Sequence, residues 1–387
     1  MAAPARSESI NTTEIGIDGG TWGNHRGYGR FLRQLLPELV RLRPDWRFTV
    51  FLDQSQDDIV SAPNLHWRVA RTQTSVSQSA RADSARSAPD LLRMSWAVTR
   101  QRLDLLFFPT VYSYFPVVGR FPVVVGIHDT MADRHPEWAF AGKVQQLLWN
   151  SKVRLALAQA SRIVTVSEYS RQSIASHFAV NASRIAVLSE GAASIFAPTG
   201  ATEEQFILAV GGISPNKNLS VLIEALAELR RDHPDLRLVL VGDYLRDGFR
   251  SSHERLVQEA AAHGITDAVR FTGYLPDEEL VALYNRCLVF VMPSLEEGFG
   301  LPLVEAMACG CACVVADGHA LREVGGDAVL RANPLSTVEW SSTIAKVIDD
   351  AKLRQTLRQK AVQRSLHYSW ERGAATLIEV FEELLTK

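Results

Sequence analysis

Residues 206–226, FILAVGGISPNKNLSVLIEAL, run from a short apolar strand through a loop with two glycines and a proline into a helix. The strand is continuously apolar rather than alternating, which is typical of a strand covered by helices on both faces. Similar apolar runs recur along the chain, in TEIGID, FTVFLD, DLLFFP, FPVVVGIHD, SRIVTVSE, RIAVLSEG, LRLVLVGD, AVRFTGY, LVFVMPS and CACVVAD. The sequence therefore predicts the α/β class with parallel sheets.

The domain organisation follows from the length and from one break in this series. The chain has 387 residues, which at about 100–200 residues per domain predicts two or three domains. Proline, glycine and small polar residues at 194–205, SIFAPTGATEEQ, indicate a linker. We expect a first doubly wound domain over residues 1–197 and a second over 198–368, which face each other across a cleft. Apolar residues at helical spacing in 369–387 predict a last helix that packs back on the first domain.

Composition excludes several classes of function. The formal net charge of -2 argues against a nucleic-acid binder. No apolar run approaches the roughly 20 residues that are needed to cross a bilayer. The first residues contain no apolar segment of the signal-peptide kind, so a cytoplasmic location is expected. Peripheral contact with the inner face of a membrane is left open.

Two other features have structural and functional interpretations. The four cysteines, Cys287, Cys309, Cys311 and Cys313, lack C-x-x-C spacing and histidine partners, so core packing is favoured over a metal site. Residues 71–90 are rich in serine and poor in apolar residues, which predicts a disordered surface loop. The alternative is a flap over an acceptor, because long loops in compact domains are often functional.

Candidate ligand-binding residues in the first half follow two strands. Gly27 and Gly29 precede a helix expected to begin near Phe31, where backbone amides can approach an anion. The spacing is not that of a dinucleotide-binding fingerprint, because Leu32 stands where the third glycine would be. His128 and Asp129 end another strand and are expected to point into the same cleft.

In the second half the candidates are Lys217 and two glutamates. Lys217 near a helix start opposes the helix dipole, which an anionic ligand would resolve. Glu297 and Glu305 flank the glycine-rich turn before a helix that starts close to Pro302. Two carboxylates for hydroxyl groups, beside amides and a lysine for phosphates, predict a site for a sugar joined to a nucleoside diphosphate.

The segment EEGFGLPLVEAMACG resembles the E-x7-E signature of glycosyltransferase family 4, which contains retaining enzymes of GT-B fold with two Rossmann-like domains. The segments VGGISPNKNL, VSEYSRQSI, LREVGGDAVLRANP and HYSWERGA are similar to other parts of the same family. The likeness extends from about Gly16 to the end of the chain, and it is strongest for mannosyltransferase-like members.

This resemblance implies roles for individual residues. Glu305 would hold the ribose, Glu297 the donor sugar and Lys217 the diphosphate, while His128 would lie near C6 and the anomeric carbon. The family usually has an arginine where this chain has Gly212, and backbone amides or other side chains would replace it. The implied donor-binding set is Glu305, Gly298, Phe299, Gly300, Leu301, Gly212, Ser214 and Asn216. The implied acceptor and phosphate loop comprises Gly27, Gly29, Arg26, Arg30 and Asp129, in which the two arginines are alternative cations.

The expected activity is that of a retaining glycosyltransferase, which moves a mannose- or glucose-type hexose to a glycan, lipid-linked or small-molecule acceptor. GDP-mannose is favoured slightly over UDP-hexoses as donor. No Asp-x-Asp occurs in the chain, so no metal and no cofactor are expected. The alternatives are a GT-B epimerase or phosphorylase and a noncatalytic sugar-nucleotide binding protein.

Overall fold

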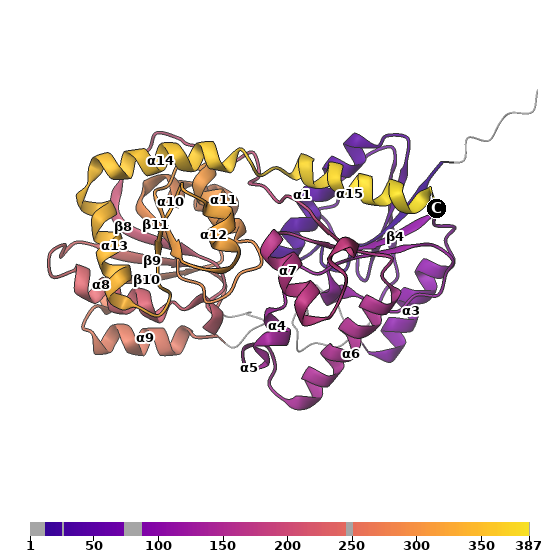
Figure 1. Ribbon diagram of the computed structural model, residues 1–387, viewed down its shortest axis with the longest axis horizontal. Coiled ribbons are helices and arrows are strands. Elements are labelled where there is room, and N and C mark those ends of the chain that lie inside the picture. Colours follow the sequence, from indigo (N-terminus) through magenta and orange to yellow (C-terminus); the bar gives the residue numbers. More distant parts are fainter. Residues whose placement is uncertain (1–11, 25–26, 73–86, 245–250, 387) are drawn as a thin grey trace, which may run out of the picture.

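The first domain is built on a seven-stranded parallel sheet in the order β3-β2-β1-β4-β5-β6-β7 (Figure 1). The computed structural model describes residues 12–24, 27–72, 87–244 and 251–386. The strands are β1 (Glu14–Asp18), β2 (Arg47–Leu52), β3 (Leu65–Val69), β4 (Leu105–Phe108), β5 (Val123–Gly126), β6 (Arg162–Thr165) and β7 (Ile185–Val187). The helices between them are α1 (Gly27–Leu42), α3 (Ala88–Thr99), α4 (Met131–Arg134), α5 (Pro136–Ala139), α6 (Lys143–Gln159) and α7 (Glu168–His177).

The second domain has a six-stranded parallel sheet in the order β10-β9-β8-β11-β12-β13. Its strands are β8 (Glu204–Val210), β9 (Arg237–Val241), β10 (Val269–Gly273), β11 (Cys287–Met292), β12 (Cys313–Ala316) and β13 (Leu330–Ala332). Its helices are α8 (Ser220–Leu229), α9 (His253–Ala262), α10 (Asp277–Arg286), α11 (Leu301–Ala308), α12 (His319–Gly325), α13 (Thr337–Asp349) and α14 (Ala351–Ser365). Both sheets are central and covered by helices, so the predicted fold class is confirmed.

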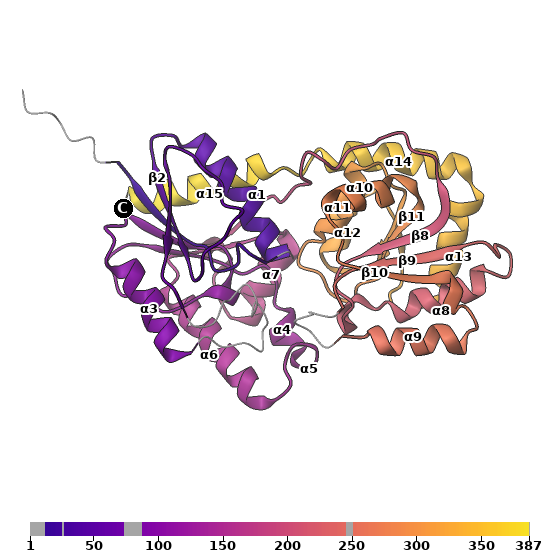
Figure 2. The same cartoon turned by 180° about the vertical axis from the view of Figure 1, so that it is seen from behind.

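The two faces of the first sheet carry separate helix layers. Phe31 and Leu35 of α1 pack with Ile15 and Ile17 of β1 on one face. Met94 of α3, Trp149 of α6 and Ile174 of α7 belong to a second cluster on the other face. Figure 2 shows α3 and α6 on the same side of this domain.

The last helix, α15 (Trp370–Leu385), returns to the first domain, as predicted. In Figure 1 it lies over α1, and one short connection, residues 366–369, joins it to α14. Phe381 is fully buried, and its ring centre lies 5.7 Å from that of Phe107 and 6.3 Å from that of Trp46. The predicted boundary at 197/198 falls between β7 and β8, and as a division into domains it stays a prediction.

The structure corrects several local predictions. The first helix begins at Gly27 and not near Phe31, so Gly27 and Gly29 lie in its first turn and not in a loop. Strands β3 and β13 were not predicted, because β3 alternates polar and apolar residues and β13 has only three residues. The predicted disordered segment lies outside the described residues at 73–86, but its end is ordered, since the Ser87 side chain caps α3.

The cysteines lie in the core of the second domain. All four cysteines are buried and free, and Cys287 and Cys311 approach to 3.8 Å between their sulfur atoms. They pack in the second-domain core as the sequence predicts.

In the described part of the chain, no helix has both the length and the apolar character required to cross a membrane.

Candidate active site

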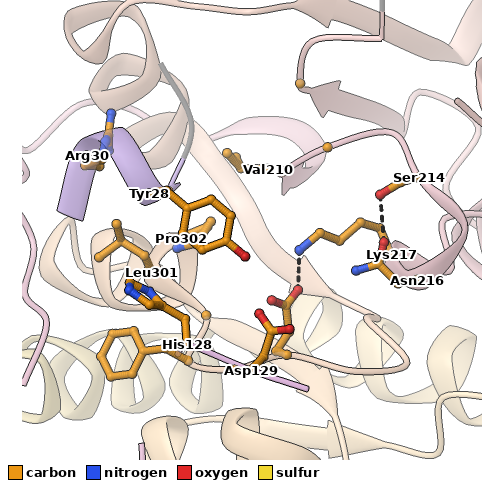
Figure 3. Close-up of a pocket in the computed structure, with 18 of the residues that line it drawn as sticks. Tyr28, Arg30, His128, Asp129, Val210, Ser214, Asn216, Lys217, Leu301 and Pro302 are labelled. Carbon is orange, nitrogen blue, oxygen red and sulfur yellow. Dashed lines mark hydrogen bonds and ion pairs between the residues drawn. The ribbon is translucent and has the colours of Figure 1, made fainter. Parts of the chain in front are cut away.

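A cavity of about 350 Å³ lies between the carboxyl ends of the two sheets. Figure 3 shows Tyr28, His128 and Asp129 of the first domain in the same space as Lys217 of the second. Of the residues expected at the site, the cavity is lined by Gly27, Arg30, His128, Asp129, Gly212, Ser214, Asn216, Lys217, Glu297, Gly298, Phe299, Gly300, Leu301 and Glu305. Gly29 is absent from this lining set, and Arg26 lies outside the described residues.

Lys217 and Glu297 form an ion pair inside the cavity (Figure 3). Lys217 ends a short 3-10 turn, Pro215–Lys217, just before α8, and Glu297 lies in the connection from β11 to α11. Their side chains are only 19% and 13% exposed. An anionic ligand would therefore meet a lysine whose charge is partly balanced and whose position is already fixed.

The connection before α11 is held tightly against the first domain. The carbonyl of Gly298 accepts hydrogen bonds from Ser167 at 2.5 Å and from Ser170 at 2.9 Å. A Cβ at Gly298 would lie 2.5 Å from the carbonyl oxygen of His128. Gly300 has φ +95°, which favours glycine, and α11 begins directly after it. Gly300, Leu301 and Pro302 line the cavity, so α11 begins at its wall, where a helix N-terminus favours an anion.

Glu305 lies one turn inside α11 and is almost fully buried. Arg30 of α1 forms an ion pair with it across the domain boundary, and Arg30 also pairs with Asp277 of α10. The Tyr284 hydroxyl donates to Glu305 at 3.4 Å. Burial raises the pKa of Glu305 to about 7, although Arg30 opposes this effect. Arg30 is thus occupied by two carboxylates, and its expected role as a phosphate cation stays a prediction.

His128 follows β5 and is held by one backbone contact. Its Nε2 lies 2.9 Å from the carbonyl oxygen of Pro109, so that nitrogen carries the proton. Burial lowers the pKa of His128 to about 4, so the ring is neutral near pH 7. The other ring nitrogen, Nδ1, is left as a hydrogen-bond acceptor.

Asp129 is the next residue along the chain and accepts the backbone N–H of Met131 at 2.9 Å. Burial raises its pKa to about 6, with Glu296 and Glu297 adding to the shift.

The loop after β8 is shaped by its own polar side chains. The Ser214 hydroxyl donates to the Asn216 side-chain oxygen at 2.7 Å, as Figure 3 shows, and both residues are buried. The backbone N–H of Leu295 donates to the carbonyl of Asn216 at 2.8 Å. Gly211 and Gly242 approach so closely that a Cβ at Gly242 would overlap the Gly211 carbonyl oxygen. Ser214 and Asn216 therefore fix the loop that carries Lys217.

Several cavity residues were not predicted. Tyr28 packs its ring 5.2 Å from that of His128 and 4.6 Å from that of Tyr112. Glu190 follows β7, and Glu296 is paired with Arg134 at 2.9 Å and with His135 at 3.1 Å. These residues form no spacing motif. Their one signal is that most follow the carboxyl end of a predicted strand, where such folds bind ligands.

The fold and the cavity together define the class, which is that of a two-domain GT-B glycosyltransferase. Two family descriptions match the chain, "Glycosyltransferase Family 4" over residues 25–192 and "Glycosyl transferases group 1" over residues 193–364. The chain therefore belongs to glycosyltransferase family 4, in its mannosyltransferase-like part. The predictions of the family and of an enzyme that transfers sugars are confirmed.

Individual relatives agree with this assignment. The O-antigen chain mannosyltransferase B of Escherichia coli is 29% identical over 309 residues, which cover 76% of this chain and 77% of that protein. The MMP alpha-(1->4)-mannosyltransferase of Mycolicibacterium hassiacum is 31% identical over 280 residues, or 69% of this chain and 66% of that protein. The Anabaena HepE structure in complex with UDP-glucose shares the fold, with TM-score 0.74, 20% identity, and 96% and 100% of the two chains covered.

Proposed function

We propose that this glycosyltransferase moves a hexose from a nucleoside diphosphate sugar to a hydroxyl group of an acceptor, with retention and without a metal ion. The observation that carries the proposal is the convergence of Lys217, the first turn of α11 and Glu305 in one cavity. A cation and a helix N-terminus suit the diphosphate, and a buried carboxyl group suits the ribose hydroxyls.

The chemistry follows from where charge develops. As the bond between the anomeric carbon and the phosphate oxygen breaks, the leaving diphosphate gains negative charge, which Lys217 and the α11 N-terminus stabilise. Lys217 then exchanges part of its contact with Glu297 for the phosphate. The acceptor oxygen bonds to the same face of the anomeric carbon, and its proton passes to the leaving phosphate oxygen.

A covalent route through Glu297 is the second candidate for retention. Glu297 lies in the cavity and would have to attack the anomeric carbon. Its ion pair with Lys217 disfavours this role, because the pair lowers the nucleophilicity of the carboxylate. Front-face attack therefore remains our first proposal.

The relatives guide the choice of substrates. The names of both curated relatives specify mannosyl transfer, which supports GDP-mannose as the donor and a growing polysaccharide or glycan as the acceptor. The fold neighbour solved with UDP-glucose keeps UDP-hexoses as the second choice. Family membership favours transfer over epimerisation, phosphorolysis or noncatalytic binding.

The decisive experiment compares ligand-induced thermal stabilisation of the wild type and Glu305→Gln with GDP, UDP, GDP-mannose and UDP-glucose. A ligand at 100 times its Kd adds about 2.7 kcal/mol to the free energy of unfolding. We expect one nucleotide family to stabilise the wild type, and the variant to need at least tenfold more ligand. Glu279→Gln, on an exposed position of α10, is the matched control and should behave as the wild type.

Absence of stabilisation by every nucleotide would contradict the proposal, as would equal stabilisation of Glu305→Gln. Transfer measured in EDTA should match transfer without it. A loss that one added divalent ion restores would overturn the metal-free mechanism.

We also propose peripheral association with an anionic membrane surface through the outer face of α6. Val144, Leu147, Leu148 and Leu155 point outward there, with exposed fractions from 51% to 72%. The same helix carries Lys143, Lys152 and Arg154 and no acidic residue. Exposed apolar side chains on a helix with basic and no acidic residues match the acyl boundary and the headgroups of anionic lipid.

The test is co-sedimentation with phosphatidylglycerol/phosphatidylcholine vesicles. The wild type should bind, and the double variant Leu147→Ser/Leu148→Ser should bind at least tenfold more weakly, because it loses two inserted side chains. Leu335→Ser/Leu366→Ser removes two leucines of the second domain that are 80% and 63% exposed, and it should bind as the wild type. Vesicle binding by Leu147→Ser/Leu148→Ser equal to that of the wild type would overturn the proposal. So would a wild type that binds no vesicles but self-associates, if this variant abolishes the self-association.

A further inference from the structure

Glu190 is a carboxyl group of the cavity that the proposed chemistry does not use. It lies beyond β7, in the segment that connects the two sheets, and its side chain is 7% exposed. Among the described residues, no hydrogen-bond donor contacts its carboxyl oxygens, and His128 and Glu305 are ionisable neighbours. A buried polar group without a partner costs about 1–3 kcal/mol, so such a group in a binding cavity points to a ligand.

The geometry around Glu190 defines what that ligand must offer. His128 Nδ1 lies 3.9 Å from Glu190 Oε1, which is too long for a direct hydrogen bond. An oxygen atom about 2.8 Å from both atoms would fit between them. Since His128 Nε2 donates to Pro109, Nδ1 can only accept, and the bridging atom must carry a hydrogen.

The protonation state of Glu190 completes the arrangement. Burial raises its pKa to about 8, and the nearby Glu305 adds to the shift. The carboxyl group is therefore protonated near pH 7 and can donate one hydrogen bond. A hydroxyl group is the ligand that accepts from Glu190 and donates to His128 at the same time, whereas a phosphate oxygen could not donate to Nδ1.

We infer that Glu190 and His128 together bind one hydroxyl group of a sugar in the cavity, and that Glu190 is a specificity-determining residue. This inference rests on the proposed function. The hydroxyl belongs either to the transferred hexose or to the acceptor, and both offer the same chemistry at this point. Loss of the hydroxyl leaves two buried polar groups unpaired, so an analogue without it is rejected more strongly than an analogue altered elsewhere.

The experiment measures kcat and KM for donor and acceptor in the wild type, Glu190→Gln and Glu190→Leu. The Leu variant should lose about 10- to 100-fold in kcat/KM, equivalent to one hydrogen bond of about 1–3 kcal/mol. The Gln variant keeps a donor at this position and should stay within about threefold of the wild type. Thermal unfolding without ligand checks that both variants fold.

Monodeoxy sugars then identify the hydroxyl. For one analogue, kcat/KM of the wild type should be much lower than with the parent sugar. Glu190→Leu should use that analogue and the parent sugar equally well, because the variant has already lost the contact. A deoxy donor with this behaviour assigns the hydroxyl to the hexose, and a deoxy acceptor assigns it to the acceptor. If the loss in kcat/KM from Glu190→Leu and the loss from the missing hydroxyl multiply for every analogue, Glu190 has a merely structural role and the inference is overturned.

The dependence on pH gives an independent readout. Two titratable groups face Glu190, His128 from the loop after β5 and Glu305 from α11. As the pH rises through about 8, wild-type kcat/KM should fall relative to that of Glu190→Gln, because Glu190 loses the proton that it donates. A ratio that does not change with pH would contradict the inference.

Failure of this inference is separable from failure of the proposed function. Stabilisation by GDP or UDP alone involves no hydroxyl group of the hexose or of the acceptor and should persist in Glu190→Leu. If nucleotides bind and transfer proceeds while Glu190→Leu is unimpaired, only the role of Glu190 is wrong.

Discussion

The second-domain wall of the cavity comes mainly from two continuous runs, residues 210–217 and 296–305, whereas the first-domain wall is assembled from side chains that follow five different strands. In the second domain the ligand-facing groups are a lysine, carboxylates and the start of α11. In the first domain they include the rings of Tyr28, Tyr112 and His128, which pack on one another.

The second-domain wall (the second wall) and the first-domain wall (the first wall) therefore bind their ligands through different interactions. Charge and backbone polarity on the second wall act on a diphosphate over several ångströms, and a few neighbouring residues suffice. The first wall must match the shape and hydroxyl pattern of a sugar, which requires packed rings and single hydrogen bonds. Removing one charge from the second wall should reduce the rate most, while disturbing the packing of the first should change acceptor use and stability.

The largest effect is expected from Lys217→Met, which removes a cation from the second wall with little change in volume. We expect kcat to fall by about 10²–10³-fold, in line with the loss of one group that stabilises transition-state charge. Steady-state transfer assays would measure this change, and the affinity for the nucleoside diphosphate should fall as well. Lys360→Met removes an exposed lysine of α14 and should leave the rate unchanged.

One complication is built into the ion pair. Lys217→Met also leaves Glu297 without its partner, and the uncompensated carboxylate could repel the diphosphate by itself. The double variant Lys217→Met/Glu297→Gln removes that repulsion. If the double variant recovers most of the rate, Lys217 serves to neutralise Glu297, and the second wall does not act by direct contact with phosphate.

The same contrast explains how much of the site the sequence could predict. Glu297, Gly298, Gly300 and Glu305 belong to one connection, so their spacing alone indicates a shared ligand. Glu190 and Tyr112 are distant in sequence from every other candidate, and a position after a predicted strand does not by itself separate a ligand-binding residue from a surface one. The sequence indicates Arg30 as a candidate cation, but its ion pair with Glu305 across the domain boundary depends on how the domains pack.

The fold shows a similar limit. Central strands such as β5 and β11 are buried along their whole length, so their apolar runs are unambiguous. Edge strand β3 is exposed at three of its five residues, and its sequence LHWRV alternates polar and apolar side chains. The start of α1 was misplaced because glycine favours loops by propensity, whereas here Gly29 is required by the close approach of the preceding turn, at the carbonyl oxygens of Thr21 and Asn24.

A smaller effect, confined to the first wall, is expected from Gly29→Ala. A Cβ at this position would overlap the carbonyl oxygen of Asn24 and lie 2.7 Å from that of Thr21. Either the start of α1 or the turn before it must move, at about 1–3 kcal/mol of unfolding free energy. The shift would displace Tyr28 and Arg30 on the same helical turn, so transfer should fall while GDP or UDP still binds the second wall.

Gly27→Ala is the matched control, because it lies in the same turn and a Cβ there meets nothing within 4 Å. Alanine is the better helix former by about 1 kcal/mol, so this variant should be as stable as the wild type or slightly more stable. Urea unfolding would measure both variants. Equal unfolding free energies would show that the turn at Asn24 yields freely, and that the first wall is no more dependent on exact packing than the second.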